Sequence, residues 1–205
     1  MNIGKRLRNF SSIKLRLLLY FFFLQIFISF WILGIENDVN LFLYFCYHSP
    51  LIIVILLLFN FENYIPSLVI FSLFAQMLYL VDFIISHLLG TSFLGYYDYS
   101  LNSSILVHIL VLLAHLTSII LVYFYNHIKP EPKHLVITFI YTFVVYLFVV
   151  TYVPIEYNIN AIQTTYTILD YLPMYHLFYV VYHLFIIAIP TYILLLQLHK
   201  LHLKK

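Results

Sequence analysis

The stretch QMLYLVDFIISHLLGTSFLGYYDY, residues 76–99, decides how this chain is organised. It reads as the second half of an apolar helix, followed by a glycine-marked exit and a loop rich in tyrosine. Asp82 lies inside the apolar run, where an ionisable side chain costs at least about 2.5–3.5 kcal/mol in a bilayer. Such groups usually face the interior of a helical bundle or a wet cavity. We therefore expect Asp82 to point into a bundle and to mark its functional region.

The composition indicates a membrane protein. Of the 205 residues, 64% are hydrophobic and 9% are charged, and a soluble domain of this size could not bury that much apolar surface. Six apolar runs reach the roughly 17–25 residues that a helix needs to cross the hydrocarbon layer. We predict an all-α, polytopic bundle of six transmembrane helices forming one domain, 1–205, with helices near 14–34, 41–60, 65–89, 103–126, 134–153 and 174–198.

The basic residues predict the orientation. In the six-span arrangement all ten Lys and Arg residues fall on one side: in 5–16, in 129–133 and in 200–205. The charged residues on the opposite side are all acidic. Cytoplasmic loops are the ones enriched in Lys and Arg, so the basic side is expected to face the cytoplasm. Both termini are therefore expected in the cytoplasm, most simply at the cell membrane. The net charge of +2 then reflects orientation, and no nucleic-acid partner is expected.

The polar side chains predicted inside the membrane gather in the half of the bundle away from the cytoplasm. They are Ser49, Asp82, His108, His115 and His183. The cytoplasmic half holds almost nothing comparable, and the helix at 134–153 reads as scaffold. The longer loops close the same outer side and carry Tyr99, Asn158 and Asn160. These residues predict a polar pocket in the outer half of the bundle, and the lipid bilayer is expected to surround the bundle.

Several short motifs resemble a family of uncharacterised bacterial polytopic membrane proteins over about residues 49–195. They are Asp82, Leu89-Gly90, Gly95, Tyr99, the His115 of the fourth span, and Asn158-Ile159-Asn160. This chain has Leu80 where that family has Trp, and Ala161 where a Trp follows the Asn pair. The resemblance implies a polytopic helical fold and no particular activity.

The chain also resembles, more weakly, the androgen-induced membrane hydrolases, which have six spans and a histidine in the fourth. Those enzymes cleave fatty-acid esters of hydroxy fatty acids, and they pair a threonine nucleophile with the histidine. Here the second helix has no threonine in its outer half, so Ser49, or less favourably Cys46, would take that place. The resemblance implies a lipid-ester substrate.

Residue chemistry supports the same hypothesis, a membrane-embedded lipid-ester hydrolase or acyl-transfer enzyme. Ser49 would attack the ester, and His115 or His108 would accept its proton. Asp82 would orient and stabilise the imidazolium. Tyr99, Asn158, Asn160 and His183 would bind the head group or the developing oxyanion.

Three alternatives stay open from the sequence. Asp82 with the histidines could form a proton relay in a transporter, although few polar residues continue the path to the cytoplasm. His48, His108, His115 and His183 could ligate haem or a metal, but no compact ligand motif is present, and no cofactor is predicted. The single Cys46 excludes an internal disulfide and a cysteine-based zinc site. The third alternative is a non-catalytic membrane protein.

Overall fold

The computed structural model describes residues 12–89, 105–126, 128–153 and 178–204, and every element there is helical. Five segments are long and apolar enough to cross a membrane: Ser12–Glu36, Glu62–Ser86, His108–Tyr125, Pro132–Tyr152 and Tyr179–His202. The predicted all-α bundle is thus confirmed, and five of the six expected spans have the required length and composition.

The elements follow one another along the chain in this order. They are α2 (Ser12–Phe30), η1 (Trp31–Glu36), η2 (Val39–Leu43), α3 (Phe45–Leu58), η3 (Glu62–Tyr64), α4 (Ile65–Leu89), α5 (Ile105–His115), α6 (Thr117–Tyr125), α7 (Pro132–Tyr152), α8 (Tyr179–Tyr182), η8 (His183–Ala188) and α9 (Ile189–His202).

Four predicted helices are less regular than the sequence suggested. The helix expected at 14–34 ends in the π-helical η1. The helix expected at 41–60 is a 3-10 turn, η2, followed by the 14-residue α3, because Tyr44 adopts an extended conformation between them. At 1.5 Å per residue α3 covers about 21 Å, less than a bilayer core. The helix expected at 103–126 divides into α5 and α6. The one at 174–198 contains the π-helical η8, immediately before Pro190, whose missing N–H disturbs the α-helical ladder.

The turns between helices use residues suited to their backbone conformation. Asn37, after η1, and Asn60, after α3, both have positive φ angles, of 53° and 60°. Asparagine tolerates this left-handed region better than most side chains. Pro66 and Pro132 lie in the first turns of α4 and α7, where no backbone N–H is needed.

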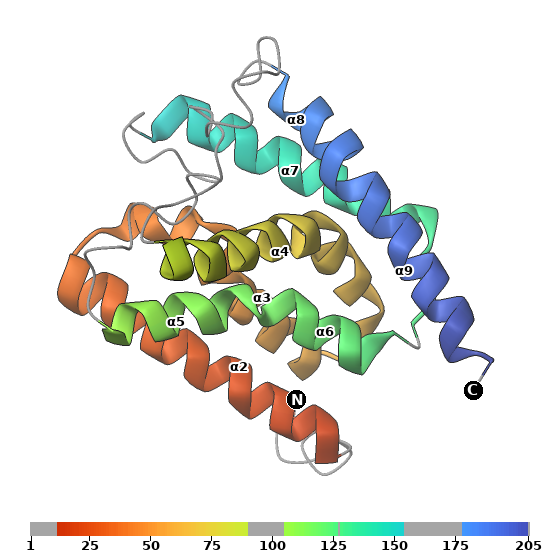
Figure 1. The fold of residues 1–205 in the computed structure, drawn as a ribbon, viewed down its shortest axis with the longest axis horizontal. Helices are drawn as coiled ribbons and strands as arrows, with labels where there is room; N and C mark the ends of the chain where they lie inside the picture. Colours follow the sequence, from red (N-terminus) through yellow and green to blue (C-terminus); the bar gives the residue numbers. More distant parts are fainter. Residues whose placement is uncertain (1–11, 90–104, 127, 154–177, 205) are drawn as a thin grey trace.

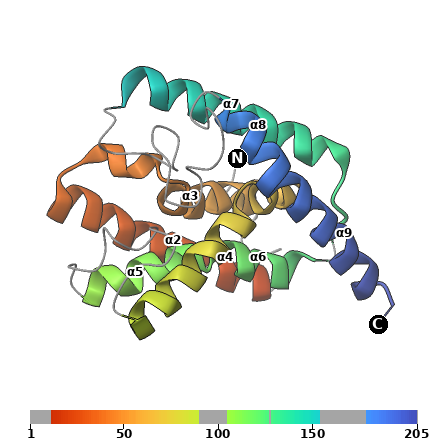
Figure 2. The same cartoon turned by 45° about the horizontal axis from the view of Figure 1, so that its top comes forward.

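Helix α4 is the centre of the bundle. It packs against α3, α5, α6, α7, η8 and α9. In Figure 1, α7 lies along one side of the molecule and α2 with α5 along the opposite side, with α4 between them, and Figure 2 again shows α7 on the side opposite α2 and α5. The stretch that contains Asp82 therefore belongs to the helix that packs against the largest number of other elements.

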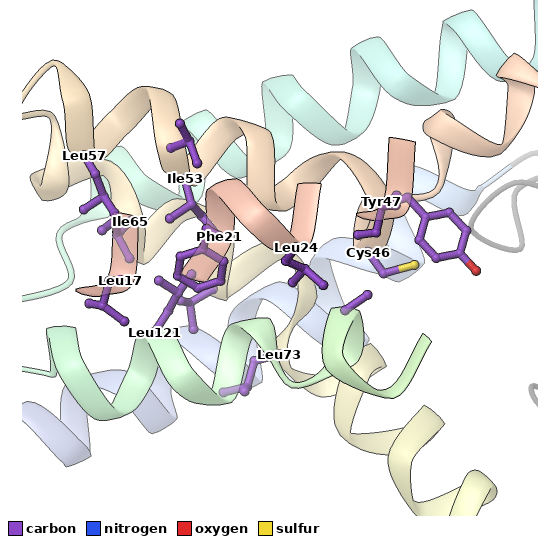
Figure 3. Packing of buried hydrophobic residues seen from close by; sticks show 14 of the residues in the cluster. Leu17, Phe21, Leu24, Cys46, Tyr47, Ile53, Leu57, Ile65, Leu73 and Leu121 are labelled. Atoms are coloured by element: carbon purple, nitrogen blue, oxygen red, sulfur yellow. The ribbon is translucent and has the colours of Figure 1, made fainter. Parts of the chain in front are cut away.

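The apolar core lies between α2, α3, α4 and α6. Figure 3 shows Phe21 of α2 pointing toward Ile53 of α3 and Leu121 of α6, and all three side chains are buried. In a membrane such contacts stabilise by close packing, since lipid tails are as apolar as the core itself. This packing holds α2, α3 and α6 together.

Candidate functional site

The described candidate residues point into the bundle. Ser49 on α3 and Asp82 on α4 have exposed fractions of 0%, and His115 on α5 and His183 on η8 have 8% and 6%. His108, on α5, is half-buried. Asp82 therefore faces the protein interior, as its position in an apolar run predicts. Tyr99, Asn158 and Asn160 lie outside the described residues.

A stripe of polar residues runs along one face of α4. Ser72, Gln76, Tyr79, Asp82 and Ser86 are spaced by three or four residues, and all five are buried. Residues at this spacing share one helix face. The seven-residue repeat of Ser72, Tyr79 and Ser86 is visible in the sequence and could have predicted the stripe, although only Asp82 was singled out from it.

His115 is held in one tautomer. Its Nδ1 lies 2.8 Å from the carbonyl oxygen of Val111, and because a carbonyl only accepts, Nδ1 must carry the proton. In the neutral ring Nε2 is therefore the proton acceptor. The ring also stacks on Tyr79 of the α4 stripe, with centroids 3.7 Å apart and planes 14° apart. The orienting bond that the sequence analysis assigned to Asp82 is thus made by a backbone carbonyl.

Ser49 lies in the interior without a hydrogen bond from any described residue. The bond between Ser49 and His115 expected for a nucleophile and its base is accordingly not formed in this structure. Pro50 follows Ser49 and removes the N–H that would bond the carbonyl of Cys46, so this turn of α3 is more polar than its side chains suggest. Helix α3 packs against both α4 and α5, the helices that carry Asp82 and His115.

His48, one of the proposed metal ligands, instead connects α3 with α7. Its Nδ1 donates to the carbonyl oxygen of Phe42 at 2.8 Å, and its Nε2 accepts from the hydroxyl of Tyr141. Both ring nitrogens are therefore occupied. Sequence reasoning treated the helix at 134–153 as scaffold and overlooked Tyr141, because nothing in the sequence shows which α7 face meets α3.

His183 belongs to an aromatic group next to this connection. Its ring lies 4.7 Å from that of Phe71 and 5.7 Å from that of Tyr179, centroid to centroid. Its Nε2 is buried and has no hydrogen-bond partner among the described residues. A buried imidazole nitrogen in this state is suited to water or to a polar group of a ligand.

Polar side chains of α4 form hydrogen bonds with α6 where it begins, next to the break between α5 and α6. The backbone N–H of Ser118, in the first turn of α6, donates to Gln76 Oε1 at 3.0 Å. The hydroxyls of Ser72 and Ser118 lie 2.5 Å apart, and that of Ser72 donates to the Leu68 carbonyl. Gln76 therefore supplies an acceptor to a helix terminus whose N–H groups otherwise lack one.

Polarity is not confined to the outer half, which corrects the sequence expectation. We use "inner end" for the end where α2 begins and α9 ends. There, His134 of α7 is buried, with Nε2 donating to the carbonyl oxygen of Asn63 and Nδ1 accepting from the Glu131 N–H, both at 2.8 Å. The Thr138 hydroxyl lies within 2.9 Å of the carbonyls of Ser67 and His134. Such side-chain bonds to backbone let polar groups be buried on helices that read as apolar.

Buried polar atoms without a partner among the described residues occur from the inner to the outer half. They belong to Tyr20, Ser49, Ser67, Gln76, Ser86, Thr117, His183 and Thr191. Most buried polar groups in proteins are hydrogen-bonded to protein or to ordered water. This set therefore marks positions around α4 where water or a polar ligand group would be stabilised.

The described residues hold no group of three or more His, Cys, Asp or Glu side chains that could bind a metal ion. His48, His108, His115, His183 and Asp82 do not converge into such a group. Together with the two occupied nitrogens of His48, this leaves the proposed metal site without support in the described part of the chain.

Comparison with known proteins identifies no relative: no family model, no curated protein and no solved structure matches this chain.

Proposed function

We propose that the chain is a multi-pass protein of the cell membrane with six spans and both termini in the cytoplasm. The asymmetric distribution of Lys and Arg supports this orientation. The one span that is not among the five long segments would be α3, the second along the chain, extended at its outer end by η2. Fusing a reporter that is active only outside the cytoplasm to residue 205 should give no activity, and an active fusion would reverse the topology.

Within that bundle we propose a lipid-ester hydrolase or acyl-transfer activity centred on Ser49 and His115. The observation that carries it is the fixed tautomer of His115, which leaves Nε2 as a buried proton acceptor. A fully buried serine hydroxyl without a described partner lies on a helix that packs against the one bearing this imidazole. A nucleophilic serine requires a base of this kind. The two groups need only come within hydrogen-bond distance on substrate binding, as catalytic contacts often do.

The proposed reaction uses the chain's own residues at each step. Ser49 Oγ attacks the ester carbonyl carbon as its proton passes to His115 Nε2. The carbon–oxygen bond to the alcohol then breaks, and the alcohol leaves with the proton from Nε2. Water, for hydrolysis, or a second alcohol, for acyl transfer, then attacks the acyl carbon and gives its proton to Nε2. The bond between that carbon and Ser49 Oγ breaks, and Nε2 returns the proton to Oγ.

The remaining candidates have supporting roles in this proposal. The carboxylate of Asp82 stabilises the imidazolium through space, since Val111 already orients the ring. His108 is the alternative base. His183, Tyr99, Asn158 and Asn160 bind the lipid head group or the oxyanion. The substrate is a membrane lipid ester that reaches the bundle from the bilayer.

A fluorophosphonate probe tests this assignment, because it reacts with activated serine hydroxyls. We expect the detergent-solubilised wild-type protein to be labelled and Ser49→Ala to be unlabelled. Ser67→Ala is the matched control: it also removes a buried serine hydroxyl without a described partner, but on the inner half of α4. Equal labelling of the wild type and Ser49→Ala, or no labelling of the wild type, would refute Ser49 as nucleophile.

A second candidate, a proton or small-solute transporter, is favoured by one observation. Buried polar groups continue from His134 at the inner end, through Ser67 and Ser72, to the outer part of the α4 stripe. The sequence alone argued against such a continuous path. In this proposal Asp82 exchanges protons with the outer side.

Liposomes containing the protein and an internal pH-sensitive dye test the transport candidate. An imposed pH gradient should collapse faster than in empty liposomes, and Asp82→Asn should restore the slow rate. A fast collapse that is unchanged in Asp82→Asn would remove Asp82 from the path. A rate equal to that of empty liposomes would exclude proton conduction.

A further inference from the structure

A cavity of about 540 Å³ opens at the inner end of the bundle. Its walls come from η3, the end of α6, the connection after α6 and the first turn of α7. Glu62, Asn63, Tyr125, Lys129, Lys133 and His134 contribute the polar part of the lining. The catalytic proposal makes no use of this space, and the transport proposal uses only His134 of its lining.

The charges around the cavity favour an anion. Glu62 is neutralised by an ion pair with Lys14 of α2, and Glu131 by Lys133 at 2.7 Å. Lys129 is exposed, and no described carboxylate lies within ion-pair distance of it. Three ammonium groups thus face two carboxylates. An anion entering here meets Lys129 without first breaking an ion pair.

The connection that carries these lysines is stiffened by proline. The sequence from 129 to 133 is Lys-Pro-Glu-Pro-Lys, so two of its five φ angles are restricted by pyrrolidine rings. The backbone of Glu131 is further held by its N–H bond to His134. Because little freedom remains to be lost when a ligand binds, the two lysines are partly pre-organised across the cavity opening.

We propose that this cavity binds a phosphate group, held by Lys129 and Lys133 with the Tyr125 side chain in its wall. The position at the end of the apolar helices matches the level of lipid head groups, and basic pockets between transmembrane helices are typical sites for anionic ones. An anionic phospholipid of the surrounding leaflet and a soluble phosphate ester share this chemistry. The site is independent of Ser49 and Asp82.

The test uses full-length protein in neutral detergent and native mass spectrometry. Phosphatidic acid and phosphatidylglycerol are added in turn, with phosphatidylcholine as the zwitterionic reference. Glycerol 3-phosphate and inorganic phosphate provide the soluble arm. The variants are Lys129→Gln and Lys129→Gln/Lys133→Gln. The control is Lys200→Gln/Lys204→Gln, which removes the same charge from exposed positions of the C-terminal tail.

We expect the wild type to retain the anionic lipids over phosphatidylcholine, and the affinity to fall about fivefold for each cavity lysine removed. The tail variant should bind as the wild type does. Competition by glycerol 3-phosphate at comparable concentrations would identify a soluble phosphate ester as the ligand, still at this site. Binding equal for all lipids with no effect of phosphate, or equal losses in the cavity and tail variants, would overturn the proposal. Because Lys129 is exposed and has no ion-pair partner among the described residues, Lys129→Gln should fold and tests the proposal even if the double variant does not.

Discussion

The imidazole of His115 and the phenol of Tyr79 stack face to face, 3.7 Å between centroids, where α5 meets the polar stripe of α4. With the Val111 carbonyl on Nδ1, this contact restricts both the tautomer and the plane of the ring. His115 therefore cannot turn without losing packing or a hydrogen bond. An imidazole restrained in this way is prepared to act as a base at Nε2, since little reorganisation remains before proton transfer.

Replacing Tyr79 with leucine should slow the labelling of Ser49 by the fluorophosphonate probe. An aromatic pair contributes about 0.5–1.5 kcal/mol beyond burial, so we expect a rate about two- to tenfold lower. The measurement is the second-order labelling rate in detergent. Tyr123→Leu is the control, because Tyr123 is 74% exposed. Equal rates for the two variants would show that stacking does not support the base.

Replacing Tyr141 with phenylalanine should destabilise the bundle. The change removes the hydroxyl that donates to His48 Nε2 and leaves a half-buried acceptor without its partner. Hydrogen bonds between transmembrane helices are worth about 0.6–2 kcal/mol, and we expect a loss in that range. The free energy of unfolding in SDS titration measures it. Tyr152→Phe, at an exposed position of the same helix, should change nothing. An unchanged Tyr141→Phe would argue against the α3–α7 connection.

Replacing Gln76 with leucine should loosen the junction between α5 and α6. The Ser118 N–H would lose its acceptor, and removing a helix cap costs about 0.5–2 kcal/mol. Hydrogen exchange of the α6 amides should then accelerate most in its first turn. Gln197→Leu serves as the reference, since Gln197 is exposed on α9. Uniform acceleration throughout the protein would indicate global destabilisation in place of a local cap.

The charge of Glu131 should make the inner end sensitive to acid. The Lys133 ammonium, which bonds this carboxylate, lowers the pKa of Glu131 below its usual value. A lowered folded-state pKa means that the ion pair stabilises the protein above the unfolded pKa and that this contribution is lost as pH falls through the folded value. The effect is small, because the pair is fully exposed to solvent.

Glu131→Gln isolates this charge, since the amide oxygen can still cap α7. We expect the wild type to be slightly more stable than Glu131→Gln near neutral pH. The two unfolding midpoints should converge as pH is lowered toward about 3. A difference that persists unchanged at the acidic end would show that the ion pair with Lys133 is not its source.

The sequence by itself determined the helical class, the presence of five long apolar segments and the burial of Asp82. The physical reason is that bilayer thickness sets segment length and that hydrocarbon excludes a lone carboxylate. Helix α4 begins and ends where its apolar run predicts. The irregularities at Tyr44 and in η8 could not be predicted from the sequence. They depend on which of several backbone conformations is favoured at single turns and next to a proline.

Only the tertiary structure decided which side chains meet. It paired His115 with Val111 and Tyr79, His48 with Tyr141, and His134 with Asn63, and it placed buried polarity in the inner half as well. In an apolar environment nearly every face of a helix is hydrophobic, so the periodicity that reveals the buried face of a soluble helix is weak here. Partner choice then rests on the close packing of whole helices, which no single segment of sequence encodes.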